Sequence, residues 1–368
     1  MGKRELIIIG AFVVVAAVVY QFTAPAPKPG ERSFSLSRIF SGIKREMTAD
    51  SKSASMTRTG TLALDPGVTE LRLTAIRAVP LTVVGERRED IGYELFVEST
   101  GPDDATAREY ANRSVLFEDD LGEARVLGIK FPEEGQQTGR LTLRVPERLQ
   151  IRFENSGRVD VSAVRAVELR NLGGDTTITD VQAQVAGSHR SGELIVSAAG
   201  TVELALSSSR AKFTGIAGAV SLKGRSGDCA IVQPRGPVEI EMLSVDVSIT
   251  EPANTVRVSG DNGTLKLVSP AKSFNIDVRR MLVEITLAAA VPGTAITTDE
   301  PLRLSLVGPP GVTIDAATIE RGAVRATELG LTPTDAPRES RLTAPVGGGG
   351  PRLLLRNTRA DIVIALRK

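Results

Sequence analysis

Apolar residues recur every nine positions along the middle of the chain, and this repeat restricts the fold more than any other feature. Ten consecutive units, from Val202 to Val283, hold an apolar residue at the same place. A second apolar residue follows two positions later in each unit, from Leu204 to Ile285. An apolar pair at i and i+2 is typical of a strand with one buried face, and its fixed repetition is typical of a stacked array. The repeat therefore predicts an all-β stack of short strands.

Prolines and outward-facing residues indicate that two such units make one coil. Pro234, Pro252 and Pro270 lie 18 positions apart, at the turn after every second strand. The outward residues alternate with the same period, because Thr or Val marks one set of strands and mainly charged or small residues mark the other. We therefore predict a parallel β-solenoid with about 18 residues per coil. A three-sided solenoid with about 27 residues per coil is the alternative, and it would place the prolines at different corners.

Changes in composition divide the chain into six segments. β-rich caps are expected at both ends of the repeats, because an uncovered end would expose a strand edge to other chains. Within the first cap, Pro102 to Asn112 is predicted to be a short helix or a loop. The segments are a short N-terminal tail (1–5), a transmembrane anchor (6–22), a linker (23–58), a β-rich N-terminal cap (59–148), the β-solenoid repeats (149–293) and a β-rich C-terminal cap (294–368).

Residues 6–22 carry no charge and are strongly apolar, which predicts one N-terminal transmembrane helix. Seventeen helical residues span roughly 26 Å, near the lower limit for crossing a bilayer. Lys3 and Arg4 precede the segment and favour a cytoplasmic N-terminus. The chain is thus expected to be a single-pass protein of the inner or plasma membrane, with its C-terminal domain in the periplasm or outside the cell. A cleaved signal peptide is the alternative, and the basic residues of the linker leave the opposite orientation open.

Composition and residue types argue against several classes of function. The net charge of +1 and the lack of interleaved aromatic and basic residues give no basis for nucleic-acid binding, and the absence of Trp counts against a sugar-binding groove. His189 is the sole histidine and is predicted to lie in a solvated turn, and Cys229 is predicted to be a buried core residue. Glu239 and Glu241 fall near basic residues of the adjacent coils, which favours solvated ion pairs over a catalytic carboxylate pair. We therefore predict no catalytic residue, no metal site and no cofactor, and expect that the chain is not an enzyme.

One uncharged column of outward residues is the candidate interaction face. β-Branched side chains give it a flat surface, which could contact a protein or cell-surface ligand, a second copy of the chain, or the chain's own C-terminal segment. A plain exposed sheet face is the equally weighted alternative. The column is formed by Thr214, Val232, Thr250, Val268 and Thr286.

The repeated units resemble those of a largely uncharacterised bacterial family of β-strand-repeat domains known as "putative adhesins". The resemblance rests on RVPERLQIRFENSGRVDVSAV, on the units SGELIV, SGDCAIV and GPVEIEM, and on the terminal LLLRNTRADIVI, and it covers about residues 59–368. It implies a right-handed solenoid outside the cytoplasm, often tethered to a membrane, and it supplies no catalytic residues. The function expected is a membrane-anchored, non-catalytic adhesion, binding or structural module of the cell envelope. An envelope-stress sensor or scaffold, and then a carbohydrate-active enzyme on a parallel β-helix, are the alternatives.

Overall fold

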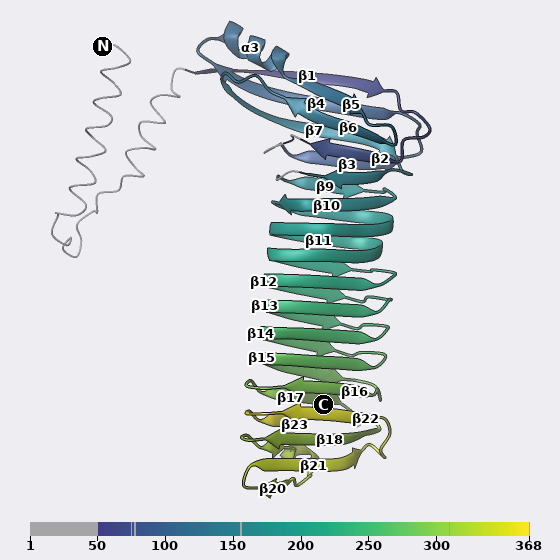
Figure 1. Cartoon of the computed structure of the whole chain (residues 1–368), viewed down its shortest axis with the longest axis vertical. Helices are drawn as coiled ribbons and strands as arrows, with labels where there is room; N and C mark the ends of the chain where they lie inside the picture. Colours follow the sequence, from purple (N-terminus) through teal and green to yellow (C-terminus); the bar gives the residue numbers. More distant parts are fainter. Residues whose placement is uncertain (1–50, 75, 77–78, 155–156, 309, 368) are drawn as a thin grey trace, which may run out of the picture.

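The computed structural model describes residues 51–74, 76, 79–154, 157–308 and 310–367. This part of the chain is all-β, with one long sheet of mixed parallel and antiparallel pairing and one α-helix among the described residues. The strands are stacked one above the other along the long axis of the molecule (Figure 1). The predicted tail and anchor, and the linker up to residue 50, lie outside the described residues.

The middle of the stack consists of parallel strands that pair in steps of 18 residues. Val202 pairs with Val220, Val220 with Val238, and Val238 with Val256. This register agrees with the predicted 18-residue period and excludes the 27-residue alternative. The strands are β11 (Thr176–Thr214), β12 (Val220–Val232), β13 (Val238–Thr250), β14 (Val256–Val268) and β15 (Phe274–Leu287).

Each of these coils has two different corners. At the first corner the strand bends but the pairing continues, so β12 and β13 are single strands of 13 residues rather than the two separate short strands that the sequence predicts. Ser226, Ser244 and Asn262 take left-handed backbone angles there (φ 62°, 55° and 66°). The second corner is a turn outside the strands, and it contains the prolines at the predicted 18-residue spacing.

The interior of the stack is one continuous hydrophobic core. The two apolar ladders predicted from the repeat point inward and are almost completely buried, as at Val220, Leu222, Cys229 and Ile231. Burying each aliphatic side chain contributes about 1.5–3 kcal/mol before the entropy of ordering is subtracted. The period-2 pattern therefore places every second side chain in this core and every other one on an outer face.

The N-terminal part continues both faces of the stack and then closes them with antiparallel strands. β2 and β3 pair in parallel with β8 and β9, whereas β1 and β4 pair in antiparallel fashion, as do β5 and β6. The strands are β1 (Lys52–Leu62), β2 (Glu70–Thr74), β3 (Leu81–Glu86), β4 (Ile91–Gly101), β5 (Val115–Asp120), β6 (Ala124–Lys130), β7 (Gln136–Pro146), β8 (Gln150–Phe153), β9 (Val159–Ser162) and β10 (Ala166–Gly173).

The boundary of the predicted linker at residue 58 is wrong. Strand β1 begins at Lys52, within the predicted linker, and it pairs with β4 along the whole length of β1, from Lys52 to Leu62. The predicted short helix is present as α3 (Asp104–Arg113), whose N-cap Asp103 accepts a 2.7 Å hydrogen bond from the Thr106 amide. Helix α3 packs on β1 and β4 at the end of the stack. It covers the outermost strand of this end, as expected for a cap.

The C-terminal part does not follow the order of the sequence. β22 pairs with β16 on one side and β18 on the other, and β23 pairs with β17 and β19. The last strands are therefore inserted between coils that precede them in the chain, and the C-terminus lies beside β16 and β17 rather than at the tip (Figure 1). The elements are β16 (Gly293–Thr297), β17 (Leu302–Val307), β18 (Val312–Ile319), β19 (Val324–Arg325), η1 (Thr327–Leu329), β20 (Thr334–Ala336), β21 (Glu339–Val346), β22 (Arg352–Asn357) and β23 (Ile362–Arg367).

Among the residues described, no helix has both the length and the apolar character needed to cross a bilayer. The predicted anchor, residues 6–22, is outside this range and stays a prediction.

Candidate interaction face

The candidate column predicted from the sequence is continuous in the structure, and we call it the Thr/Val stripe. Each of its members pairs in register with the next one along the stack. All of these side chains are half-buried, because neighbours from the coils on both sides cover their flanks. The stripe consists of Thr214, Val232, Thr250, Val268 and Thr286.

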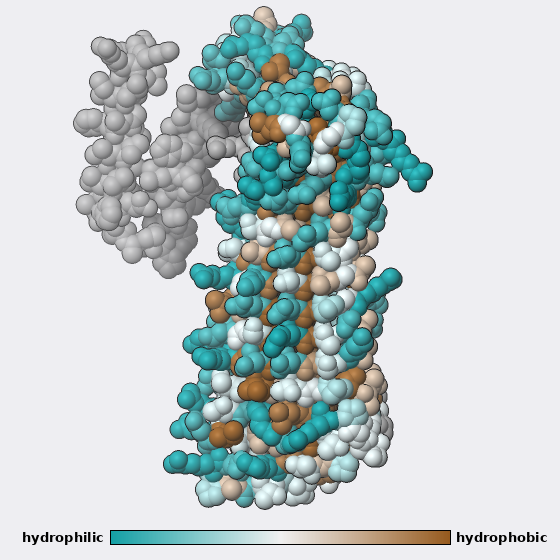
Figure 2. Space-filling model, turned by 45° about the vertical axis from the view of Figure 1, so that its right-hand side comes forward, coloured by the Kyte–Doolittle hydropathy of each residue, from teal (hydrophilic) through white to brown (hydrophobic). Residues whose placement is uncertain are grey.

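Two flat faces run along the stack, and the stripe belongs to one of them. We call this the Thr/Val face, and it consists of the outward residues of segments 210–214, 228–232, 246–250, 264–268 and 282–286. The opposite Glu/Lys face consists of the outward residues of segments 202–206, 220–224, 238–242, 256–260 and 274–278. In the view of Figure 2, bands of apolar and weakly polar side chains alternate with hydrophilic ones along the stack.

A second column beside the stripe is charged, so only the stripe itself matches the predicted uncharged surface. This column is in register through the same pairings, and small residues occupy its middle. A shallow groove of about 470 Å³ lies on this face, and Ala230 and Ser248 are among the residues that line it. The column consists of Lys212, Ala230, Ser248, Lys266 and Glu284.

The charges around the groove are only partly paired. Arg210 and Asp228 lie 3.6 Å apart, with more than half of each side chain exposed. Within the described part of the chain, Lys212, Lys266 and Asp246 take part in none of the ion pairs shorter than 4.0 Å. The groove thus has cationic ends and an acidic side, with no excess of one sign that would select a polyanion or a polycation.

Of the ion pairs that the sequence predicts on the Glu/Lys face, the structure has the one between Lys223 and Glu241. Glu239 pairs in register with Arg257. Lys223 and Glu241 lie 3.3 Å apart with 74% and 65% of their side chains exposed. Exposed pairs of this kind contribute about 0–1 kcal/mol and leave both carboxylates in an ordinary solvated environment. Nothing in this arrangement prepares either glutamate for proton transfer.

The prediction that His189 lies in a solvated turn is wrong, because the side chain is completely buried. Its Nδ1 lies 2.8 Å from the Ser209 Oγ and its Nε2 lies 3.0 Å from the Gly174 carbonyl oxygen. The carbonyl can only accept, so Nε2 donates and Nδ1 accepts in the neutral ring. The inward position follows from the corner, where His189 pairs with the buried Leu172 of the preceding coil. This Ser–His pair has no access to a substrate, and it serves to satisfy polar atoms inside the corner.

Burial of His189 predicts a loss of stability on mild acidification. Burial lowers the pKa of this ring below 6.5, although its hydrogen bond to Gly174 and the charge of Asp175 act in the opposite direction. Since the unfolded chain binds the proton more readily, stability is complete above pH 6.5 and falls as the pH decreases toward the lower pKa of the folded state, by at most about 1.4 kcal/mol per pH unit. Urea unfolding between pH 7.5 and 5.5 measures the slope.

The variant His189→Gln is the control, because it removes the only histidine titration in the chain and keeps groups that can donate and accept hydrogen bonds. Its stability should change less than that of the wild type over the same pH range. Equal slopes for the two proteins would contradict the assignment of the pH dependence to His189.

Cys229 is buried in the core with 2% of its surface exposed, as predicted. Burial raises the pKa of its thiol to about 12. The thiolate is the reactive form, so this cysteine is inert at neutral pH.

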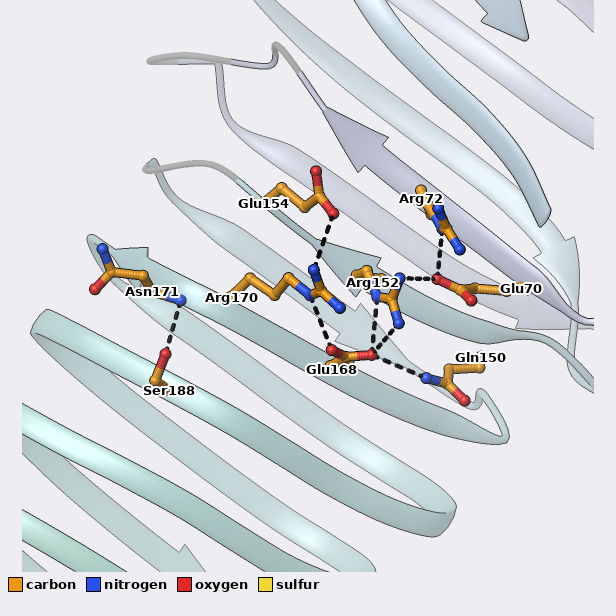
Figure 3. A network of polar contacts seen from close by, with 9 residues as sticks. All are labelled: Glu70, Arg72, Gln150, Arg152, Glu154, Glu168, Arg170, Asn171 and Ser188. Atoms are coloured by element: carbon orange, nitrogen blue, oxygen red, sulfur yellow. Dashed lines mark hydrogen bonds and ion pairs between the residues drawn. The ribbon is translucent and has the colours of Figure 1, made fainter. Parts of the chain in front are cut away.

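A half-buried ionic network joins the N-terminal cap to the first coils on the outside of β2, β8 and β10 (Figure 3). Arg152 lies 2.9 Å from Glu70 and 2.7 Å from Glu168, and Arg170 also bonds Glu168 at 3.0 Å. Burial disfavours the charged form of Glu168, but the hydrogen bonds from the two arginines outweigh this effect and keep the pKa of the carboxyl below 4.5. The network therefore holds three strands in register and leaves no reactive carboxylate.

The structure brings together no group of three or more His, Cys, Asp or Glu side chains suited to a metal ion among the residues that it describes.

Comparisons with known proteins identify only solved structures. No family model matches the chain, and no curated protein matches it significantly. A "putative cell adhesion protein" from Clostridium sporogenes is 13% identical with a TM-score of 0.20, over 85% of this chain and 100% of that one. "Putative adhesins" from Parabacteroides merdae and Parabacteroides distasonis are 9% and 11% identical, with TM-scores of 0.28 and 0.29, over 85% of this chain and 97% of each of theirs.

Proposed function

We propose that the chain is a non-catalytic adhesion module of the bacterial envelope, built as a right-handed parallel β-solenoid and anchored in the inner or plasma membrane by residues 6–22. Its C-terminal domain then lies outside the cytoplasm, in the periplasm or at the cell surface. The 18-residue register of β11 to β15 supports the solenoid. The uncharged apolar run preceded by Lys3 and Arg4 supports the anchor and its orientation.

The observation that carries the proposal is the Thr/Val stripe. Five uncharged, half-buried side chains form a straight column along the stack, bordered by a groove and by charged residues. A flat surface of this kind, with an apolar centre and a polar rim, has the anatomy of a protein interface.

Two lysines in the stripe are expected to weaken adhesion at least tenfold without unfolding the protein. Val232→Lys combined with Val268→Lys places charges at the centre of the proposed contact, but both positions are half-exposed, so each lysine can reach water. We expect at least a tenfold decrease in attachment or aggregation of cells carrying the chain, because truncating or charging residues at an interface centre costs about 1 kcal/mol or more each.

The matched control is Ala205→Lys combined with Ser259→Lys, which adds the same charges at exposed positions of the Glu/Lys face. It should adhere like the wild type. Protease accessibility of the C-terminal domain in intact and permeabilised cells tests its location. Cleavage only after the cytoplasmic membrane is opened would refute an extracytoplasmic module, and equal adhesion by both lysine variants would refute the role of the stripe.

A further inference from the structure

The Thr/Val face has a chemical symmetry that points to one kind of partner. Read along the stack, the stripe is Thr, Val, Thr, Val, Thr, and it is unchanged when its direction is reversed about Thr250. If two copies face each other in opposite directions, Val232 lies opposite the partner's Val268 and Thr214 lies opposite the partner's Thr286. Apolar residues then meet apolar residues, and hydroxyls meet hydroxyls.

The charged column beside the stripe becomes complementary under the same reversal. Its centre is Ser248, which pairs with Ala230 on one side and with Lys266 on the other. Reversal about Ser248 places Lys212 opposite the partner's Glu284. Because a two-fold axis relates the two copies, Glu284 also lies opposite the partner's Lys212. Opposite charges therefore face each other at both ends of the contact.

Size is complementary in the same way as charge. Lys266 is exposed, whereas Ala230 lies in the floor of the groove. Reversal brings the partner's Lys266 over Ala230, beside the carboxylates of Asp228 and Asp246. The two Asp246 side chains then lie near the axis, each next to the partner's lysine, which offsets their repulsion. A long cation thus enters a hollow lined by small and acidic residues.

The area of the face is sufficient for a specific dimer. The five residues of each strand segment extend about 16 Å. The five coils of the Thr/Val face and one further coil on each side, from Glu193 to Ser305, extend about 30 Å or slightly more along the stack. The flat contact is then roughly 500 Å² per copy and roughly 1,000 Å² in total, which is at the lower limit for a biological interface. Side chains that interdigitate increase this value.

We propose that a second copy of this chain binds the Thr/Val face, antiparallel to the first, about a two-fold axis that passes between the Ser248 residues of the two copies. The interface is isologous, so every contact occurs twice and the assembly closes at two chains. The N-terminal strands of the two copies point in opposite directions. In one respect the inference rests on the proposed function: if both chains are anchored through residues 6–22, the antiparallel dimer links two membrane surfaces.

Thiol cross-linking of the full chain in detergent tests the geometry. Facing sheets lie about 10 Å apart, too far for a disulfide, so a short bismaleimide is used. The native thiol does not interfere, since Cys229 is buried. Ser248→Cys lies on the axis and should cross-link to itself. Ala230→Cys should not, because it faces the partner's Lys266, and neither should Ser259→Cys on the Glu/Lys face.

An exchange of the large and the small residue tests the contact itself. Ala230→Lys places two lysines opposite each other and should give a monomer in sedimentation velocity. Lys266→Ala removes the inserted cation and should weaken the dimer. The double variant restores one lysine and one alanine at each contact and should recover the dimer. Thermal unfolding of each variant confirms that the chain is folded.

A dimer cross-linked through Ser248→Cys alone, broken by Ala230→Lys and recovered by the double variant, establishes the proposal. A monomeric wild-type chain overturns it, as does equal cross-linking through Ala230→Cys or Ser259→Cys. Vesicles carrying the full chain distinguish this outcome from the proposed function: a dimer in detergent that fails to tether vesicles retains the inferred interface and refutes adhesion by linking membranes.

Discussion

Replacing Leu354 by proline is expected to destabilise the C-terminal part of the stack by at least about 3 kcal/mol. Leu354 lies in β22 and pairs with Thr294 of β16 on one side and Asp315 of β18 on the other. Proline removes an N–H from a strand that has partners on both sides, and its ring cannot be accommodated in a central strand. The leucine side chain points outward, so the change removes no core residue. Urea unfolding and limited proteolysis measure the effect.

Asp335→Pro is the matched control, because β20 pairs only with β21 and forms the edge of the stack. Its free energy of unfolding should decrease by less than about 1 kcal/mol, since an edge strand tolerates proline. Equal losses in the two variants would contradict the central position of β22. Proteolysis of the Leu354→Pro variant should release the segment from β18 to β21 first, because β22 provides most of its parallel pairing with the preceding coils and the pairing of β19 with β23 covers only two residues.

The position of this last coil could not be predicted from the repeat. The sequence shows that Leu353 and Leu355 have the same spacing as the other inward pairs, and both are buried as expected. The order of stacking depends on the antiparallel pairing of β18 and β21, which lets residues 312–346 form the outer layer while the chain returns beneath it. Any apolar pair fits against any coil, so the pattern alone does not determine which coil is the neighbour.

The register and the candidate column follow from the sequence because both depend only on periodicity. An 18-residue step aligns Thr214 with Val232 and Lys212 with Ala230, and the structure has these pairs. The packing at the corners could not be predicted, because the sequence does not show which side chains fill the inside of a tight bend. His189 is an example, since a polar residue between Ser188 and Arg190 suggests exposure, yet its ring is enclosed by the coils next to it.

The first corner also has a longer period that the nine-residue pattern conceals. Leu206, Met242 and Val278 are buried at equivalent places in alternate coils, and Gly224 and Gly260 occupy that place in the coils between them. A Cβ on Gly224 would lie 2.2 Å from the Met242 Sδ. Large residues of one coil therefore fill the space that the glycines of the next coil leave open, and the corner repeats every second coil.

Gly227, at the same corner, is constrained by the backbone of the adjacent coil and is expected to be sensitive to substitution. Its φ is 124°, a conformation that residues with a side chain rarely adopt, and a Cβ would lie 2.2 Å from the Ser209 carbonyl oxygen. Because the clash is with the backbone of the adjacent coil, no rotation of a side chain can relieve it. We expect Gly227→Ala to lower the free energy of unfolding by roughly 3–5 kcal/mol, through backbone strain and separation of the two coils.

Gly215→Gln separates this effect from the general loss of a glycine. Gly215 also has a positive φ of 65°, but a Cβ there would meet nothing within 4 Å. Gln233 and Glu251 occupy the equivalent corner of the following coils with φ of 52° and 51°, so a side chain is already accepted at this place. Gly215→Gln should therefore cost less than about 1 kcal/mol, the usual penalty of the left-handed region. If urea unfolding gave the two variants the same stability, the close approach of coils at Gly227 would not be the cause, and the glycines of the first corner would have to act through flexibility of the unfolded chain instead.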